Sequence, residues 1–210
     1  MIANIHSLLP SSSVNGPGQR AVLWFQGCTL SCNGCWNQET HSLKGGTHYP
    51  IWKLMDWIQE ATKNPAIEGI TLSGGEPMQQ APVVIELLIA LNRYMPRLGI
   101  GMFSGYSAKE LRTGAFHFAH DAAYRMDALK ANLRIEMWYE IQRRLDFAIL
   151  GRYNAGKPNP NPMTTSTNQE LVLYSNRYTA ADFPPQTTEV QIDEAGLVQI
   201  SGFPTLGNIN

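Results

Sequence analysis

Residues 21–38 read AVLWFQGCTLSCNGCWNQ and join an apolar run to a cysteine-rich loop. The run over residues 21–26 predicts a buried strand, because short apolar runs bounded by glycine are typical of strands covered on both faces. Cys28, Cys32 and Cys35 follow at a C-x3-C-x2-C spacing. In a parallel α/β fold, functional groups gather at the carboxyl ends of strands. We therefore expect a site directly after this strand.

The rest of the chain alternates between strand and helix patterns, which indicates an α/β fold with mostly parallel strands. A chain of 210 residues is too short for eight βα units, so we expect an incomplete (β/α) barrel with a C-terminal β-hairpin. Residues 11–18 are rich in Ser, Gly and Pro and are expected to form a loop. After the cysteine loop we expect strands over residues 68–73, 98–103, 146–150 and 171–174, and helices around residues 51–58, 83–91, 107–112 and 121–145.

We expect a single domain over residues 1–210, with a helical elaboration at about 114–145 and a hairpin at about 188–202. The hairpin prediction depends on Glu194-Ala195-Gly196, which separates two short strand patterns. A stripe of apolar residues at helical spacing in the elaboration predicts core packing rather than a cofactor role. This stripe consists of Met126, Leu129, Leu133, Met137 and Ile141.

Composition excludes several classes of function. Sixteen Lys and Arg against seventeen Asp and Glu leave a net charge of −1, which provides no electrostatic attraction to nucleic acid or to an anionic membrane. Residues 1–15 lack the pattern of a signal peptide, and no apolar stretch approaches the roughly 18 residues that span a bilayer. We expect a cytoplasmic protein without a nucleic-acid or membrane partner.

The chain has only three cysteines, all within the loop that follows the first predicted strand. An odd number of clustered cysteines argues against a disulfide framework and favours metal binding. Zinc is one alternative, with His41 as the fourth ligand of a closed tetrahedral site. A [4Fe–4S] cluster is the other, because clusters normally take four thiolates, and three leave one iron open. That iron can bind the amino and carboxylate groups of S-adenosylmethionine.

A second motif ends the next predicted strand, where residues 71–77 read TLSGGEP. Gly74 and Gly75 let a ligand approach the backbone closely, and Glu76 offers a carboxylate to a ligand ammonium group. The structural alternative is a tight turn with Pro77 at the first helical position. The three clustered cysteines one strand earlier favour the ligand-binding interpretation.

Together, these motifs resemble the radical S-adenosylmethionine superfamily, and more closely the activating proteins of anaerobic ribonucleoside-triphosphate reductase, which are glycyl-radical-enzyme activases. Gly34 stands where many superfamily members have an aromatic residue, and Trp36 follows the third cysteine, an arrangement that the activator subgroup shares. Asn15 replaces an Asp that is frequent in activators. The stretches that carry the resemblance are residues 15–20, 26–28, 32–37, 73–77, 104–106 and 166–169, together with Thr40.

The resemblance implies a cofactor set and a partner. It assigns Cys28, Cys32 and Cys35 to a [4Fe–4S] cluster, and the Gly-Gly-Glu segment to the methionyl amino group of S-adenosylmethionine. It implies a partial (β/α) barrel, a large glycyl-radical enzyme as partner, and an electron donor such as flavodoxin or ferredoxin. The cofactor-binding residues expected on this basis are Gly34, Trp36, Gly74, Gly75, Glu76, Pro77, Ser104, Gly105, Tyr106 and Arg152.

Some of these residues have an equally good structural interpretation. Trp36 can stack on the cluster or adenine, or anchor its loop. Ser104, Gly105 and Tyr106 end a predicted strand on the ligand side, but can equally form a strand-to-helix turn. Arg152 can pair with the carboxylate of S-adenosylmethionine, or lie solvated in a loop.

Three functions compete. The first is a glycyl-radical-enzyme activase, which a small domain with one cluster and no spare cysteines favours. The second is a radical enzyme that modifies a peptide or a small molecule, for which the helical elaboration and the hairpin would build a substrate surface. The third is a zinc-bearing or cluster-bearing interaction module, which leaves the Gly-Gly-Glu motif unexplained.

Overall fold

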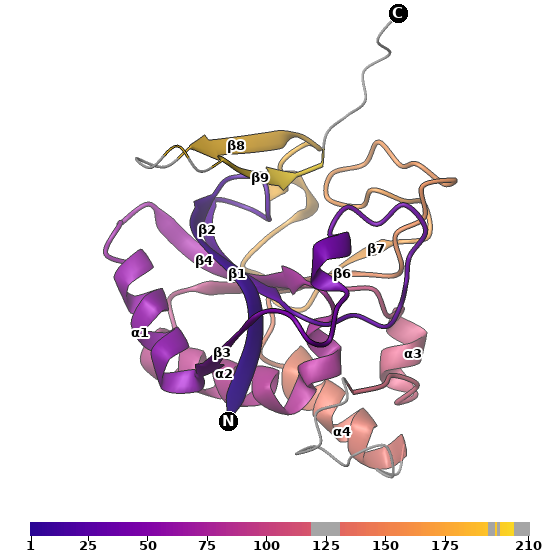
Figure 1. The fold of residues 1–210 in the computed structure, drawn as a ribbon, viewed down its shortest axis with the longest axis horizontal. Helices are drawn as coiled ribbons and strands as arrows, with labels where there is room; N and C mark the ends of the chain where they lie inside the picture. Colours follow the sequence, from indigo (N-terminus) through magenta and orange to yellow (C-terminus); the bar gives the residue numbers. More distant parts are fainter. Residues whose placement is uncertain (119–130, 193–195, 197, 204–210) are drawn as a thin grey trace, which may run out of the picture.

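A computed structural model describes residues 1–118, 131–192, 196 and 198–203. Its centre is a seven-stranded sheet in the order β3-β1-β2-β4-β5-β6-β7 (Figure 1). The strands are β1 (Ile2–Ser12), β2 (Gln19–Phe25), β3 (Thr47–Pro50), β4 (Ile67–Gly74), β5 (Gly99–Ser104), β6 (Phe147–Leu150) and β7 (Glu170–Leu173).

The pairing of the strands confirms a parallel centre and adds antiparallel flanks. β2, β4, β5 and β6 pair in parallel, as the alternation of strands and helices predicts. β1, β3 and β7 pair antiparallel to their neighbours, and β3 and β7 form the two edges. The sheet is therefore mixed and open, with four parallel strands in the middle.

β1 and β3 were not predicted from the sequence. The loop predicted over residues 11–18 is partly wrong, because Ser11 and Ser12 end β1. β1 is held by its antiparallel ladder to β2, with Leu8 opposite Leu23. β3 is an edge strand of four residues that pairs with the beginning of β1. Both strands depend on pairing with distant residues, which local periodicity does not reveal.

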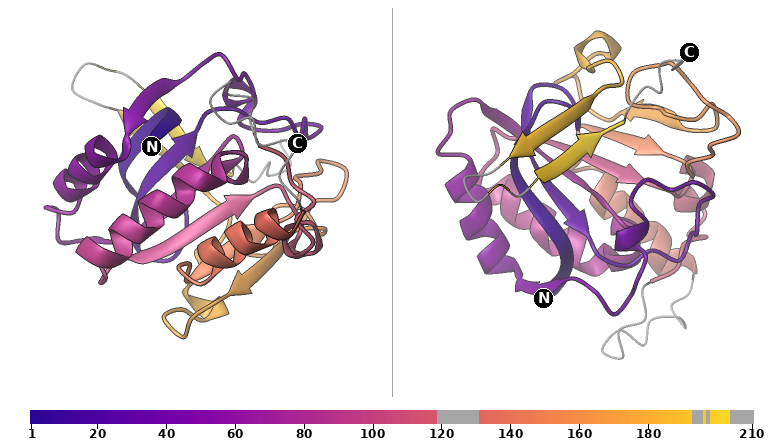
Figure 2. Two further views of the ribbon diagram at one scale, coloured as in Figure 1. Left: turned by 90° about the horizontal axis from the view of Figure 1, so that it is seen from below. Right: turned by 45° about the horizontal axis from the view of Figure 1, so that its top comes forward.

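Helices cover one face of this sheet (Figures 1 and 2). α1, α2 and α4 lie side by side there, in contact with one another in that order. The polypeptide also makes short 3-10 turns at η1 (Gln38–Thr40), η2 (Pro77–Gln80) and η3 (Ala180–Asp182). The helices are α1 (Ile51–Ala61), α2 (Ala81–Tyr94), α3 (Ala108–Arg112) and α4 (Ala131–Gln142).

The main core lies between these helices and the sheet. Leu72 of β4 and Met102 of β5 point into it, opposite Leu87 and Leu88 of α2, and all four side chains are fully buried. In α4 the predicted stripe is only partly correct. Ile141 is buried, but Leu133 is exposed, and Trp138 takes the central buried position instead. Met126 and Leu129 lie outside the described residues.

Arg20 links the amino-terminal halves of three strands by hydrogen bonds inside the protein. Its side chain is fully buried, and its guanidinium donates to the carbonyls of Ile70 and Gly99 at 2.7 Å each. It also donates to the Thr71 hydroxyl at 2.7 Å. A buried charge needs every donor satisfied, and these partners join β2 to β4 and β5. Arg20 therefore supports the sheet at the end opposite to the cysteine loop.

The predicted C-terminal hairpin is confirmed. β8 (Thr188–Ile192) pairs with β9 (Val198–Gly202) as a separate two-stranded sheet. It lies across the side of the large sheet that carries no helices (Figures 1 and 2). The Gln191 amide donates to the Ser11 carbonyl at 2.6 Å, which fastens the hairpin to the end of β1. None of the helices in the described ranges is both long and apolar enough to cross a bilayer.

Candidate functional site

A cavity of about 610 Å³ lies between the helix-free face of the sheet, the cysteine loop and the hairpin. Each of the four parallel strands contributes a side chain to its floor, namely Trp24, Ser73, Phe103 and Ile149. Side chains alternate between the two faces of a strand, so their sequence neighbours point into the core. The strands thus present one face to the helices and the other to the cavity.

The three cysteines all line this cavity. The Cys35 N–H donates to the Cys32 carbonyl at 3.2 Å, which closes a tight turn around Gly34. At the base of the loop, the Cys28 N–H donates to the His41 carbonyl at 3.2 Å. The loop is therefore closed by its own backbone, and the thiols are held on the cavity side.

Two buried glutamines, which the sequence analysis missed, brace the loop. Gln26 donates to the Ser42 carbonyl at 2.7 Å, and its Oε1 lies 2.9 Å from His6 Nδ1. Gln79 accepts from the Thr29 N–H at 3.2 Å and donates to the Thr29 hydroxyl at 2.6 Å. Gln26 stands inside a stretch that carries the family resemblance, so a signal for it existed. Gln79 had no comparable signal.

The glycine pair brings the Gly-Gly-Glu segment into contact with the start of the cysteine loop. The Gly75 N–H donates to the Phe25 carbonyl at 2.8 Å, and the Glu76 N–H donates to the Gly27 carbonyl at 3.0 Å. A Cβ on Gly75 would lie 2.4 Å from the Gly27 oxygen, so only glycine fits. Gly75 thus permits the close approach of the Gly27 backbone at the start of the cysteine loop, and Gly74 permits that of the β2 backbone at Phe25. Gly74 and Gly75 also line the cavity.

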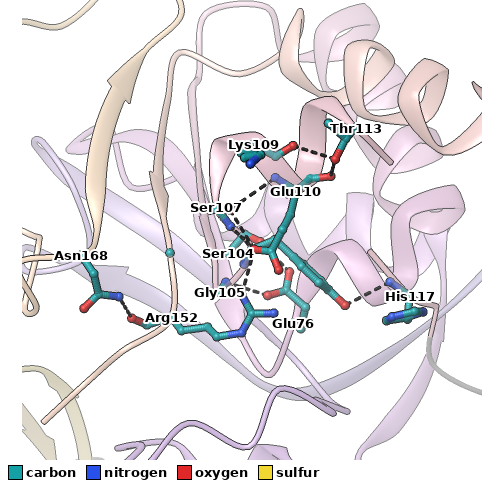
Figure 3. A network of polar contacts seen from close by, with 12 residues as sticks. Glu76, Ser104, Gly105, Ser107, Lys109, Glu110, Thr113, His117, Arg152 and Asn168 are labelled. Atoms are coloured by element: carbon teal, nitrogen blue, oxygen red, sulfur yellow. Dashed lines mark hydrogen bonds and ion pairs between the residues drawn. The ribbon is translucent and has the colours of Figure 1, made fainter. Parts of the chain in front are cut away.

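Glu76 connects the carboxyl ends of two parallel strands (Figure 3). Its side chain is fully buried and accepts from the Met78 N–H and the Ser104 hydroxyl at 2.9 Å each, and from the Gly105 N–H at 2.7 Å. Burial raises the pKa of Glu76 to about 7, although all three donors favour the ionised carboxylate. Glu76 also caps η2, and Pro77 takes the first position of that turn, as its alternative interpretation predicts.

Arg152 lies beside this connection (Figure 3), and its guanidinium contacts the ring of Tyr106. Tyr106 is buried, and its hydroxyl accepts from the His117 N–H at 3.1 Å. The Arg152 guanidinium lies 5.6 Å from the centre of the Tyr106 ring and forms an ion pair with Glu110 at 2.8 Å. The hydrogen bond from Arg152 lowers the pKa of Glu110 to about 2. The carboxylate that Arg152 meets here is therefore one of the protein's own.

Thus the structure gathers only part of the predicted cofactor set around the cavity. Those that line it are Trp36, Gly74, Gly75, Glu76, Ser104 and Gly105, together with the three cysteines. The remaining four, Gly34, Pro77, Tyr106 and Arg152, lie outside its lining. Pro77 and Tyr106 are buried, whereas Gly34 is exposed in the cysteine loop and Arg152 is partly exposed.

An aromatic group lines the cavity beside the end of β9. Phe203, which directly follows β9, meets Trp36 edge-on with ring centroids 5.6 Å apart. Tyr153, which follows β6, also packs against Phe203, with ring centroids 5.5 Å apart. All three residues line the cavity. Phe203 could not be predicted as a site residue, because nothing local in the sequence connects it to the cysteine loop.

The donor set fits an iron–sulfur cluster better than a single zinc ion. Within the described residues, no three His, Cys, Asp or Glu side chains converge as ligands of one ion. A closed zinc site needs four ligands around one point, whereas cluster thiolates bind separate iron atoms. His41 Nε2 is buried without a hydrogen-bond partner, and no such group forms around it.

Burial also affects the ionisation of the three thiols. Desolvation raises the pKa of Cys28 to about 12, and it raises the pKa values of Cys32 and Cys35 as well. A metal ligand must be a thiolate, so binding of the cluster displaces these protons.

Comparison with known proteins agrees with this geometry. Residues 14–172 match the family model described as a 4Fe-4S single cluster domain. The anaerobic ribonucleoside-triphosphate reductase-activating protein of Vibrio cholerae is 38% identical over 112 residues, which cover 51% of this chain and 72% of that protein. The chain belongs to this family of reductase-activating proteins.

Other members of the activating-protein family show how the similarity is distributed. The Escherichia coli K12 protein is 35% identical over 113 residues, which cover 51% of this chain and 72% of that protein. The protein of enterobacteria phage T4 is 29% identical over 170 residues, which cover 80% of this chain and 92% of the phage protein. The family model ends at residue 172, so β8, β9 and Phe203 lie beyond it.

Proposed function

We propose that this radical S-adenosylmethionine enzyme generates a glycyl radical on a large partner, an anaerobic ribonucleoside-triphosphate reductase. One observation carries the proposal. The only three cysteines of the chain line the same cavity as the Gly-Gly-Glu segment and Ser104-Gly105. The relatives that match this chain are named for activating that reductase.

When bound, a reduced [4Fe–4S] cluster supplies one electron that cleaves S-adenosylmethionine to methionine and a 5′-deoxyadenosyl radical, which takes a hydrogen atom from the target glycine. Cys28, Cys32 and Cys35 would hold that cluster. The backbone of Gly74 and Gly75, with Glu76, would orient the methionyl amino group. Ser104, Gly105 and Trp36 would complete the cofactor contacts.

The remaining members of the predicted set act indirectly in this proposal. Gly34, Pro77, Tyr106 and Arg152 support the residues that touch the cofactor. We also propose one domain whose open sheet forms the incomplete barrel around the cofactor, in a cytoplasmic protein. The electron comes from an external donor such as flavodoxin or ferredoxin.

The first experiment tests the chemistry. The purified protein is reconstituted anaerobically with iron and sulfide, then given dithionite and S-adenosylmethionine. We expect 5′-deoxyadenosine, and we expect Cys32→Ala to lose both bound iron and product. Asn33→Ala, in the same loop without a thiol, is the matched control and should retain the iron. A Cys32→Ala protein that kept its iron and its turnover would contradict the ligand assignment.

The second experiment tests the partner. The anaerobic reductase of the same organism is added to the reconstituted enzyme, and the glycyl radical is measured by electron paramagnetic resonance. We expect a radical on the reductase that depends on S-adenosylmethionine. Normal formation of 5′-deoxyadenosine without a glycyl radical would reject this partner and favour modification of a peptide or a small molecule.

A further inference from the structure

The C-terminal hairpin has one polar and one apolar face, and the apolar face points away from the rest of the protein. A strand pair that covers a core would have its apolar face turned inward. The hairpin's polar side chains face the protein, where Gln191 bonds to Ser11 and the Asn15 amide bonds to the Ser201 hydroxyl. Its apolar side chains point away and are all more than half exposed, namely Val190, Ile192, Val198 and Ile200. Exposed apolar groups gathered in one place mark an interaction surface.

One edge of the hairpin borders the cavity. Six consecutive residues, 198–203, line the cavity, although side chains alternate between the faces of a strand. A run of consecutive lining residues means that the edge of β9 itself faces the cavity. Figure 1 likewise draws β9 on the side of the hairpin nearer to the large sheet. An extended chain that entered the cavity would therefore pass beside β9.

The register of the ladder shows which backbone groups this edge presents. The Phe203 N–H donates to the Thr187 carbonyl at 2.9 Å, so this pair occupies a hydrogen-bonded position. Antiparallel ladders alternate hydrogen-bonded and non-hydrogen-bonded pairs, and the register has no bulge. The Val190–Ile200 and Ile192–Val198 pairs are therefore non-hydrogen-bonded, and their N–H and C=O groups point outward.

The outward backbone groups of β9 are unpaired within the described part of the chain. The hairpin has two strands only, so neither outer edge has a strand beside it there. A row of unpaired N–H and C=O groups is a template for an added strand. On the β9 side, Val198 and Ile200 carry these outward groups, and both residues line the cavity and have an exposed apolar side chain.

We propose that the β9 edge binds, by strand addition, the extended polypeptide segment of the partner that carries the target glycine. This inference rests on the proposed function and names the surface on which its substrate docks. Main-chain hydrogen bonds in such an addition fix the register of the bound segment, while alternate side chains meet apolar contacts. The reacting atom is the backbone Cα of the target glycine, so a surface that forms hydrogen bonds to the backbone positions this atom directly.

The chain offers a matched pair of variants for the test. Ile200→Pro removes one outward N–H from the β9 edge without removing a ladder hydrogen bond, because Ile200 occupies a non-hydrogen-bonded pair. Val190→Pro makes the same change at the residue directly opposite, on the β8 edge. Both variants are reconstituted with the cluster and mixed with the anaerobic reductase. We measure the Kd for the reductase and the glycyl radical formed per 5′-deoxyadenosine.

We expect Ile200→Pro to raise the Kd about tenfold or more and to lower the radical yield, while Val190→Pro stays within about twofold of the unmodified enzyme. Equal effects of the two variants, or no effect of Ile200→Pro, would overturn the proposal. The proposal would also be overturned if the unmodified enzyme self-associates and Ile200→Pro abolishes this self-association without weakening the binding of the reductase.

A second pair of variants tests the same surface in case the proline variants do not fold the hairpin. Ile200→Ser keeps the N–H and removes the apolar side chain, and Val190→Ser is its control. Hydrogen exchange at the ladder amides of Gln199 and Ser201 shows whether the hairpin is intact. We expect Ile200→Ser to weaken reductase binding about threefold and Val190→Ser to leave it unchanged. Equal binding by the two would contradict docking on β9.

The outcomes separate this inference from the proposed function. If the unmodified enzyme forms 5′-deoxyadenosine but neither binds nor activates the reductase, both the partner assignment and the docking surface are rejected. If activation proceeds normally in Ile200→Pro and Ile200→Ser with intact hairpins, only the docking surface is rejected.

Discussion

Phe203 meets Trp36 edge-on, with ring centroids 5.6 Å apart. The contact joins the end of the C-terminal hairpin to the residue that follows the third cysteine. The hairpin lies beyond the residues that match the family model, whereas Trp36 lies within them. The segment outside the matched region is thus in direct contact with the loop that would hold the cluster.

The Phe203 contact predicts a role in protecting the cluster. Phe203→Ala removes two aromatic contacts, each worth about 0.5–1.5 kcal/mol beyond the area that it buries. We expect the cysteine loop to open more often, so that the reconstituted protein releases iron several times faster in limiting oxygen. Phe203→Leu keeps most of the side-chain volume, so its rate of iron release should lie between those of the unmodified protein and Phe203→Ala. An unchanged rate of iron release in Phe203→Ala would show that the contact does not hold the loop.

The Gly75 contact predicts a severe steric effect. A Cβ at this position would lie 2.4 Å from the Gly27 oxygen, a backbone atom that cannot rotate away. We expect Gly75→Ala to lower the free energy of unfolding by about 1–3 kcal/mol, because overpacking forces the backbone to move. Denaturant unfolding measures the loss.

Gly156→Ala is the control for this substitution. Its Cβ would meet only a side-chain oxygen of Asn154, at 3.3 Å. Surface substitutions of this kind usually change stability by less than about 0.5 kcal/mol. Equal stability of the two variants would mean that the Phe25–Gly27 backbone shifts more easily than its hydrogen bonds suggest.

The raised pKa of Glu76 predicts a dependence of stability on pH. Its pKa is about 7 in the folded protein, against an ordinary value of 4.5. The folded state therefore binds more protons between these values. Its contribution to stability is complete below pH 4.5 and is lost as the pH rises through 7, by up to about 3 kcal/mol.

Glu76→Gln removes this titration. The variant should be less stable than the unmodified protein at pH 5, by about 1–3 kcal/mol, because its amide cannot satisfy all three donors. The difference should shrink at pH 8. Denaturant unfolding at both pH values provides the comparison, and a difference that did not change with pH would mean that Glu76 titrates outside this range.

The ion pair between Arg152 and Glu110 distinguishes two roles for Arg152. If its role is structural, Arg152→Gln and Glu110→Gln should each cost about 0.5–1 kcal/mol at pH 7, since the pair is partly exposed. The lowered pKa of Glu110 means that this contribution exists above pH 4.5 and disappears as the pH falls toward 2.

The affinity for S-adenosylmethionine decides between the roles. We expect the Kd to change by less than about threefold in both variants, because Arg152 lies outside the cavity lining. Calorimetric titration of the reconstituted protein measures it. A tenfold loss in Arg152→Gln alone would restore Arg152 as a direct partner of the cofactor carboxylate.

Several features of the candidate site could be predicted because they depend on residues near one another in the chain. The spacing of Cys28, Cys32 and Cys35 limits the chemistry of the loop, and the Gly-Gly-Glu segment is visible one strand later. Alternation of strands and helices indicated the parallel centre of the sheet. Their shared cavity follows from topology, because the carboxyl ends of parallel strands meet at one edge.

Other features of the site depend on partners far away in the sequence. Two interpretations of Arg152 were open, a partner of the cofactor carboxylate or a solvated loop residue, and nothing near it in the chain indicated Glu110, which lies 2.8 Å away. Gln79 had no signal in the sequence, yet it bonds to Thr29 of the cysteine loop. Local patterns carry no information on such pairs.

The sequence by itself determined that this protein has three thiols for one metal centre, an α/β core and a C-terminal hairpin. Each depends on residue type and short-range periodicity, which operate before any long-range contact forms. Only the tertiary structure decided that Glu76 is buried between two strand ends, that Phe203 reaches Trp36, and that the β9 edge borders the cavity. Burial and pairing between distant segments arise when the sheet assembles, and they change both the pKa of a carboxyl group and the surroundings of an exposed edge.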